Sequence, residues 1–205
     1  MTLFYPNGQP YRGTEKQTQQ ASQSPVVYGH RGMTLEEDLN ASNRYYLETD
    51  RGVIYKKPTP VQIVHVDYPK RSAAKITEAY FRKASTTDYN GIYRGKYIDF
   101  EAKETTHSNY IPLKNFHSHQ VEHMKRIKRH GGIGFIIVRF TQSDDIFLLD
   151  ADYLADCWSA AQKGRRKSIP KSLFQEKGFM IPQKYLPRID YLRVVDDVYF
   201  KTGHI

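Results

Sequence analysis

The stretch Ser85–Thr105, STTDYNGIYRGKYIDFEAKET, ends in a regular alternation of apolar and ionic residues. The even positions are Ile98, Phe100 and Ala102, and the odd positions are Tyr97, Asp99, Glu101 and Lys103. Successive side chains of a strand point to opposite faces, so each set shares one face. We therefore expect a strand that places its even residues in a core and its odd residues along a surface or a cleft.

A second carboxylate precedes this strand. Asp88 lies thirteen residues before Glu101, and both Asn90-Gly91 and Arg94-Gly95 offer turns between them. Two antiparallel strands joined by such a turn would bring Asp88 next to Glu101. Thr86 has the same strand parity as Asp88, so it would point the same way.

Two converging carboxylates repel each other, and a divalent cation lets both stay ionised. Oxygen ligands suit Mg²⁺ or Mn²⁺, which bind beside phosphates. Lys103 would then stand beside the metal-bound water and stabilise charge growing on a phosphate. This set predicts metal-dependent phosphodiester hydrolysis. The alternative is a surface strand on which Glu101 and Lys103 only form an ion pair. Asp99 could also replace Asp88 as a metal ligand, although we rank it lower, as a salt-bridging residue.

The composition favours an anionic partner. The chain has 205 residues, a mass of 23.9 kDa, a formal charge of +9 and a pI near 9.4. Such a field attracts polyanions, and the 16 Tyr and 10 Phe offer faces for base stacking. Nucleic acid is the leading candidate, and a merely basic surface is the alternative. The length suits one domain with appendages.

The single cysteine, Cys157, excludes an intramolecular disulfide and a cysteine-built metal cage. No apolar run approaches a membrane span, and the longest is interrupted by Arg139. The N-terminus lacks the apolar stretch of a secretory signal. We expect a cytoplasmic protein without a membrane segment.

The chain divides into a tail and a domain. Residues 1–28 are rich in Gln, Ser, Gly and Pro and predict a flexible tail, whereas 29–205 would form the domain. Thr34 and Glu37 form a capping box for a helix that extends to about Glu48, with Arg31 close to its start.

The segment from about Val53 to Phe81 is rich in β-branched residues but is cut by prolines, which central strands exclude. This pattern predicts strand segments at a sheet edge or a projecting arm, which we call the stalk, at about residues 56–75. The alternative is an ordinary surface strand pair. The cations that flank its apolar piece are Lys56, Lys57, Lys70, Arg71 and Lys75. We expect these residues, together with Arg31, to bind DNA.

The remaining segments alternate between helix and strand patterns. They are a helix over 118–130 that stops at Gly131, strands over 133–140 and 145–150, a helix over 151–162 and a last element over 188–200. This order predicts an α/β domain with a mixed central sheet flanked by helices.

Four pieces of the sequence together resemble a known family: GHRGMTLEEDLN, TTDYNG, YIDFEAKET and the downstream SHQVEHM. The chain resembles the RecU-type Holliday junction resolvases of Gram-positive bacteria, within the PD-(D/E)XK nuclease superfamily, from about Gly29 to the C-terminus. Thr87 stands where the superfamily label has proline, a position that carries no chemistry.

The resemblance implies a restriction-endonuclease-like fold with a protruding stalk, and a homodimer that makes paired nicks in four-way DNA junctions with Mg²⁺. By the same resemblance, Thr86, Asp88, Glu101 and Gln120 are the metal-site residues, and Lys103 stabilises the transition state. RecA and the branch-migration machinery are implied as partners. A junction has two-fold symmetry, which also suits a dimer with one site per subunit.

Two other functions and one other metal site are the alternatives. A non-catalytic protein that binds branched DNA and modulates a strand-exchange recombinase would need no acidic cluster. A sequence-specific restriction enzyme would need a base-reading element, and none is evident. His119 and His123 have zinc-binding spacing, but a third ligand is missing, so we expect them on a solvated or phosphate-facing surface.

Overall fold

The computed structural model describes residues 33–81 and 86–201. The predicted tail over 1–28 and Arg31 lie outside the described residues. Within them, every helix is too short or too polar to span a lipid bilayer.

A six-stranded sheet forms the centre of the domain. Its strands, in spatial order, are β1 (Val53–Lys56), β4 (Tyr89–Tyr93), β5 (Lys96–Thr105), β7 (Ile133–Phe140), β8 (Asp145–Asp150) and β10 (Phe179–Met180). The β5–β7 pair is parallel and the other pairs are antiparallel. The sheet is therefore mixed, which confirms the predicted α/β class.

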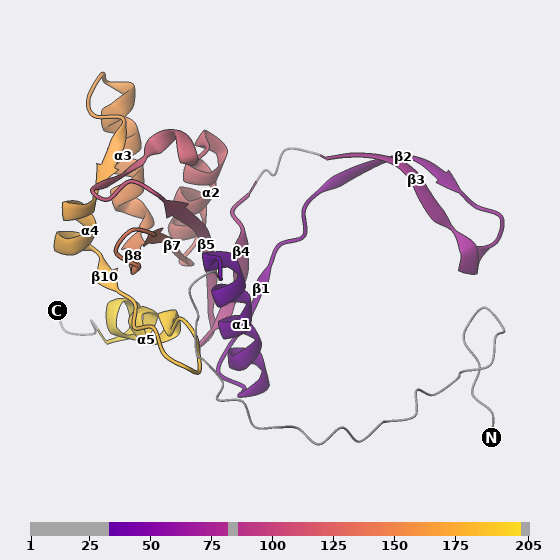
Figure 1. Cartoon of the computed structure of the whole chain (residues 1–205), viewed down its shortest axis with the longest axis horizontal. Helices are drawn as coiled ribbons and strands as arrows, with labels where there is room; N and C mark the ends of the chain where they lie inside the picture. The colour runs from indigo at the N-terminus through magenta and orange to yellow at the C-terminus, as the bar shows by residue number, and fades with distance from the viewer. Residues whose placement is uncertain (1–32, 82–85, 202–205) are drawn as a thin grey trace, which may run out of the picture. The chain divides into compact units, whose positions relative to one another are not determined.

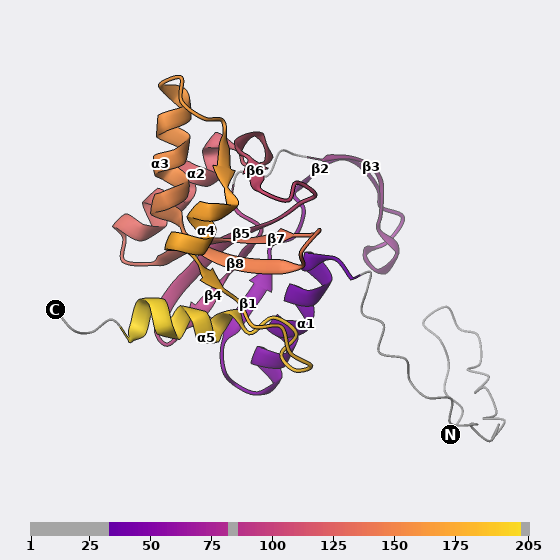
Figure 2. The same cartoon turned by 60° about the vertical axis from the view of Figure 1, so that its left-hand side comes forward.

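Helices cover both faces of this sheet (Figure 2). On one face lie α1 (Leu35–Glu48), α5 (Tyr191–Val195) and the π-helical turn η3 (Asp196–Phe200), and on the other lie α2 (Ser118–Arg129), α3 (Ala151–Gln162) and α4 (Lys171–Lys177). β7 shows why two cores result: Phe135 and Ile137 pack with the first set, whereas Ile136 and Val138 pack with the second. A near-continuous run of apolar residues, whose successive side chains point to opposite faces, is typical of a strand that is buried from both sides.

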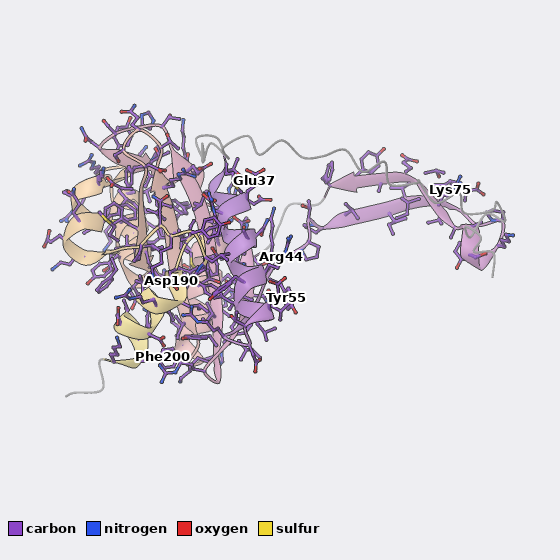
Figure 3. The ribbon with its side chains drawn as sticks, turned by 60° about the horizontal axis from the view of Figure 1, so that its bottom comes forward. Glu37, Arg44, Tyr55, Lys75, Asp190 and Phe200 are labelled. Carbon is purple, nitrogen blue, oxygen red and sulfur yellow. The ribbon has the colours of Figure 1, made fainter. Side chains whose placement is uncertain are left out.

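The ends of the helices follow the predicted signals. The Glu37 amide donates to Thr34 Oγ1 (3.2 Å) and the Thr34 amide donates to Glu37 Oε2 (2.8 Å), which confirms the capping box. Figure 3 shows Glu37 near this end of α1. Gly131, with φ +79°, follows α2, as predicted for a helix stop.

The segment between β1 and β4 forms a hairpin of its own. β2 (Val61–Asp67) and β3 (Lys75–Phe81) pair only with each other, and the short 3₁₀ turn η1 (Arg71–Ala73) joins them (Figure 1). Nearly every described side chain of the two strands is exposed, including Lys75 (Figure 3). Most residues of this hairpin therefore add little to the core.

A second small sheet pairs β6 (Tyr110–Pro112) with β9 (Ser168–Pro170), and the 3₁₀ turn η2 (Leu113–Asn115) follows β6. The Leu113 amide donates to the Lys167 carbonyl (3.1 Å), which ties η2 to the loop before β9. This small sheet lies beside α3, whose residues contact β9.

The turn between β4 and β5 is at Arg94 and Gly95, which have φ values of +49° and +75°. Two residues with positive φ are what a tight hairpin turn requires. The other predicted turn, Asn90-Gly91, is wrong because both residues lie inside β4. Gly91 instead allows β1 to approach: a Cβ there would lie 2.1 Å from the Val53 carbonyl oxygen.

Candidate active site

The candidate site lies where β5 continues beyond β4. Tyr89 pairs with Phe100, so the β4 ladder stops just before Glu101 while β5 continues to Thr105 beside β7. Asp88 is the residue that precedes the last ladder pair, and this register places it opposite Glu101. Among the described residues, one edge of β5 is therefore without a strand partner at the position of the predicted chemistry.

Asp88, Glu101 and Lys103 lie together at this edge. The Asp88 amide donates to Glu101 Oε2 (3.1 Å). Lys103 Nζ lies 3.7 Å from Asp88 Oδ2 and forms an ion pair with Glu101 Oε1. The side chain of Glu101 is 0% exposed, whereas those of Asp88 and Lys103 reach solvent. The predicted convergence of the two carboxylates and the lysine is thus present, with Glu101 at the bottom of the site.

Burial has the largest effect on the pKa of Glu101. It raises the pKa of this carboxyl to about 7, with the Lys103 ammonium opposing the rise and the Asp88 carboxylate adding to it. Glu101 Oε1 is also buried, and among the described residues its contact is the ion pair with Lys103. A cation bound here would favour the ionised carboxylate.

The donor set fits a hard divalent cation. Carboxylate oxygens from Asp88 and Glu101 are the ligands that Mg²⁺ and Mn²⁺ prefer, and Mg²⁺ keeps several waters of its own. No three His, Cys, Asp or Glu side chains of residues 33–81 and 86–201 gather as a metal cage. A metal would therefore depend on two carboxylates, further oxygen ligands and water.

A cleft of about 280 Å³ opens beside this group. Three segments line it: Thr34, Leu35 and Glu36 at the start of α1, Asp88 and Tyr89, and Ala102, Lys103 and Glu104 at the end of β5. The Leu35 amide donates to Glu104 Oε1 (3.1 Å), which connects α1 to β5. Glu36 and Glu104 are cleft residues that the sequence patterns did not predict, although the Glu36 position in the first turn of α1 was a usable signal.

Asp99 is not exposed toward this cleft but lies at the centre of a buried cluster. Its oxygens accept hydrogen bonds from Lys57 Nζ (2.7 Å), the Tyr97 hydroxyl (3.1 Å) and the Thr87 hydroxyl. His123 Nε2 lies 3.2 Å from the same carboxylate. Asp99 is thus a salt-bridging residue, as ranked. His123 is half-buried, because its ring faces this buried carboxylate.

Gln120 and Thr86 lie in different surroundings. Gln120 is buried at the start of α2, where its Oε1 accepts the His117 amide (2.9 Å). That oxygen caps the helix, and its second lone pair remains available. Thr86 is half-buried and lies two residues before Asp88. Their role as metal ligands stays a prediction.

The predicted DNA-binding cations are divided between two settings. Lys70 and Lys75 are exposed in the hairpin. Lys56 is also exposed, but it ends β1 and forms an ion pair with Glu36. Lys57 differs because its ammonium donates to Asp99 and to the Thr87 hydroxyl (3.0 Å). The backbone of Arg71 lies in η1, and Arg31 is outside the described residues.

Comparison with known proteins places the chain in a family. The family model "Recombination protein U" matches residues 30–197. The chain is 59% identical over 201 residues to "Holliday junction resolvase RecU" of Geobacillus kaustophilus, covering 98% of this chain and 99% of that protein. A protein of the same name from Shouchella clausii is 55% identical over 201 residues, covering 98% and 96%. The chain therefore belongs to the Recombination protein U family.

Proposed function

We propose that this protein is an endonuclease that resolves Holliday junctions. The observation that carries the proposal is the group of Asp88, Glu101 and Lys103 at the open edge of β5, beside a cleft, in a chain whose relatives are named Holliday junction resolvases. The non-catalytic alternative is not favoured, because binding alone gives no reason to bury a carboxylate beside a second one.

Each residue has a distinct part in this reaction. Asp88 and Glu101 would hold Mg²⁺, or Mn²⁺ in its place, with Thr86 and Gln120 as further oxygen ligands. A metal held there would supply Lewis-acid chemistry at the scissile phosphate and a water of lowered pKa. Lys103 lines the cleft and contacts both carboxylates, so its ammonium stabilises the negative charge that grows on the phosphate oxygens.

The same proposal includes a homodimer. A four-way junction has two-fold symmetry, and resolution requires two matched nicks. One active site per subunit of a symmetric dimer would place one cut on each of two opposite strands. The proposal also includes RecA and the branch-migration machinery as partners, and the cytoplasm as the location.

Junction binding would depend on cations of the hairpin and its base, Lys56, Lys70, Arg71 and Lys75, together with Arg31. Phosphate contacts of Lys and Arg provide most of the affinity for branched DNA and make it dependent on salt. Lys57 is the exception, since its ammonium already pairs with the buried Asp99.

The test is cleavage of an end-labelled four-way junction beside a linear duplex of the same sequence, in Mg²⁺ and in EDTA. We expect symmetric nicks in the junction alone, and none in EDTA. Equal cleavage of the duplex would contradict structure selectivity. Tight junction binding without cleavage in Mg²⁺ or Mn²⁺ would favour the non-catalytic binding protein.

A further inference from the structure

An apolar groove of about 390 Å³ lies apart from the cleft of the active site. One side comes from β6 and η2, with Pro112, Leu113 and Lys114, and the other from α3, with Trp158, Ala161 and Gln162. Lys167 completes the lining, which shares no residue with the cleft beside Asp88. Apart from the lysine and glutamine heads, the groove presents apolar surface, which is the setting that receives an apolar side chain.

Cations surround this groove. Lys114 and Lys167 belong to its lining, and Lys163, Arg165 and Arg166 lie in the exposed loop that joins α3 to β9. Among the residues that the structure describes, none of these five forms an ion pair. The nearest acid in sequence on α3 is the exposed Asp156, two residues before Trp158. The rim therefore has a strong positive charge that no ion pair of residues 33–81 and 86–201 neutralises.

The positions of these cations are fixed by the fold. The Leu113 amide donates to the Lys167 carbonyl, so the loop is attached to η2 on the far side of the groove. Arg166 Nε donates to Ser168 Oγ (2.8 Å), in the strand that pairs with Pro112. The backbone of Lys167 and the guanidinium of Arg166 are thus held beside the apolar lining, which is a partly preorganised arrangement.

Charge and polarity together select the occupant. DNA phosphates match the cations, but the phosphodiester backbone offers no apolar group to fill the groove, and only an unpaired base could stack on Trp158. Residues 1–32 of this chain are a poor match, because they contain Arg12, Lys16 and Arg31 against the single acid Glu15. A protein segment that combines carboxylates with one large apolar residue matches both features.

We propose that this groove docks a short acidic segment of a partner protein, with an aromatic or aliphatic anchor against Trp158 and carboxylates against Lys114 and Lys167. The proposal does not rest on the proposed nuclease function. It assigns the face formed by α3, β6 and η2 to protein recruitment and leaves the cleft beside Asp88 to chemistry.

Trp158 is the only tryptophan of the chain and lies in the groove, so its fluorescence reports occupancy directly. The probe is the synthetic peptide Asp-Asp-Glu-Asp-Leu-Phe, titrated into the full-length protein. We expect a saturable shift of the emission. Replacing Leu and Phe of the peptide with Ala should weaken binding by roughly ten- to hundredfold, because the buried apolar area is lost.

The variant Lys114→Gln/Lys167→Gln should weaken peptide binding by about tenfold and leave junction cleavage unchanged. Both side chains reach the surface, so the fold should be kept, which thermal unfolding checks. The matched control is Lys70→Gln/Lys75→Gln, which removes the same charge from the hairpin and should bind the peptide as the parent does.

Three results would overturn the proposal. The first is no saturable shift, or equal binding of the peptide without its anchor. The second is the same Trp158 shift with a single-stranded oligonucleotide, which would make the groove a nucleic-acid surface. The third is a changed oligomeric state of Lys114→Gln/Lys167→Gln in sedimentation, which would mean that a second copy covers the groove.

Discussion

Lys57 Nζ lies 2.7 Å from Asp99 Oδ2, and the side chain of Asp99 is 0% exposed. Lys57 follows β1, and its amide also donates to the Asp88 carbonyl (2.8 Å). Thr87, which bonds to Asp99, lies next to Asp88 in the chain. The pair therefore fixes the backbone that carries one of the proposed metal ligands.

Lys57→Met should destabilise the fold. Removing one partner of a buried ion pair leaves the other charge uncompensated, which costs about 3 kcal/mol. Lys56→Met is a matched control, since the neighbouring Lys56 pairs with Glu36 at the surface and such a pair contributes less than about 1 kcal/mol. Chemical denaturation measures both variants. Equal stability of the two would show that Lys57 does not support the fold.

Glu101 should give the stability an unusual pH dependence in the absence of metal. Its pKa is raised from 4.5 to about 7 mainly by burial, so its contribution to folding is present below about pH 4.5 and is lost as pH rises through about 7. Glu101→Gln cannot ionise. In EDTA at about pH 8 it should be more stable than the parent by up to about 3 kcal/mol.

Thermal and chemical unfolding across this pH range measure the difference, which should vanish near pH 4.5. Glu48→Gln is the control, because Glu48 is exposed and should show no such gain. If the parent protein is as stable as Glu101→Gln at about pH 8 in EDTA, burial does not destabilise the ionised carboxylate of Glu101.

Gly91 should not tolerate a side chain. A Cβ at this position would lie 2.1 Å from the Val53 carbonyl oxygen and 2.6 Å from Ile54 Cα, so β1 would have to move. We expect Gly91→Ala to cost at least about 3 kcal/mol of folding free energy. Gly95→Ala is the comparison for the effect of backbone conformation alone. Gly95 has φ +75°, but a Cβ there would have no neighbour within 4 Å, so this variant should cost only about 1 kcal/mol. Urea denaturation compares the two, and equal costs would contradict the account.

The cations of the hairpin should determine the salt dependence of junction binding. Each phosphate contact that is lost lowers the slope of log affinity against log salt by about 0.9. Neutralising Lys70, Arg71 and Lys75 together should therefore flatten the slope markedly, whereas Lys177→Gln, an exposed change on α4, should not. Filter binding at several salt concentrations provides the slopes. An unchanged slope in the triple variant would remove the hairpin from the DNA interface.

Local sequence patterns predicted much of the fold and of the site. The alternation from Tyr97 to Lys103 and the capping box of Thr34 depend on neighbours in sequence, and both are present. The convergence of Asp88 and Glu101 followed from one hairpin. The wrong turn at Asn90-Gly91 has a physical cause, because the glycine is required by the approach of β1, a contact between strands that no local pattern reveals.

Other features depend on contacts between distant segments. The parallel pairing of β5 with β7 and the burial of Asp99 by Lys57 and His123 join residues that are far apart in the chain. Glu36 and Glu104 meet at one cleft only because α1 lies across the end of β5. The sequence could therefore identify the residues that carry the chemistry, but not the other residues that line the cleft.

The most direct test of the account is junction cleavage by Asp88→Asn, measured in Mg²⁺ with enzyme in excess and beside junction binding by the same variant. We predict that cleavage falls by at least about a hundredfold while junction affinity stays within the range of the parent. The control Asp197→Asn changes an exposed aspartate that pairs with Lys201, and it should cleave normally. Parental cleavage rates in Asp88→Asn would contradict the proposed metal site and, with it, the proposed nuclease mechanism.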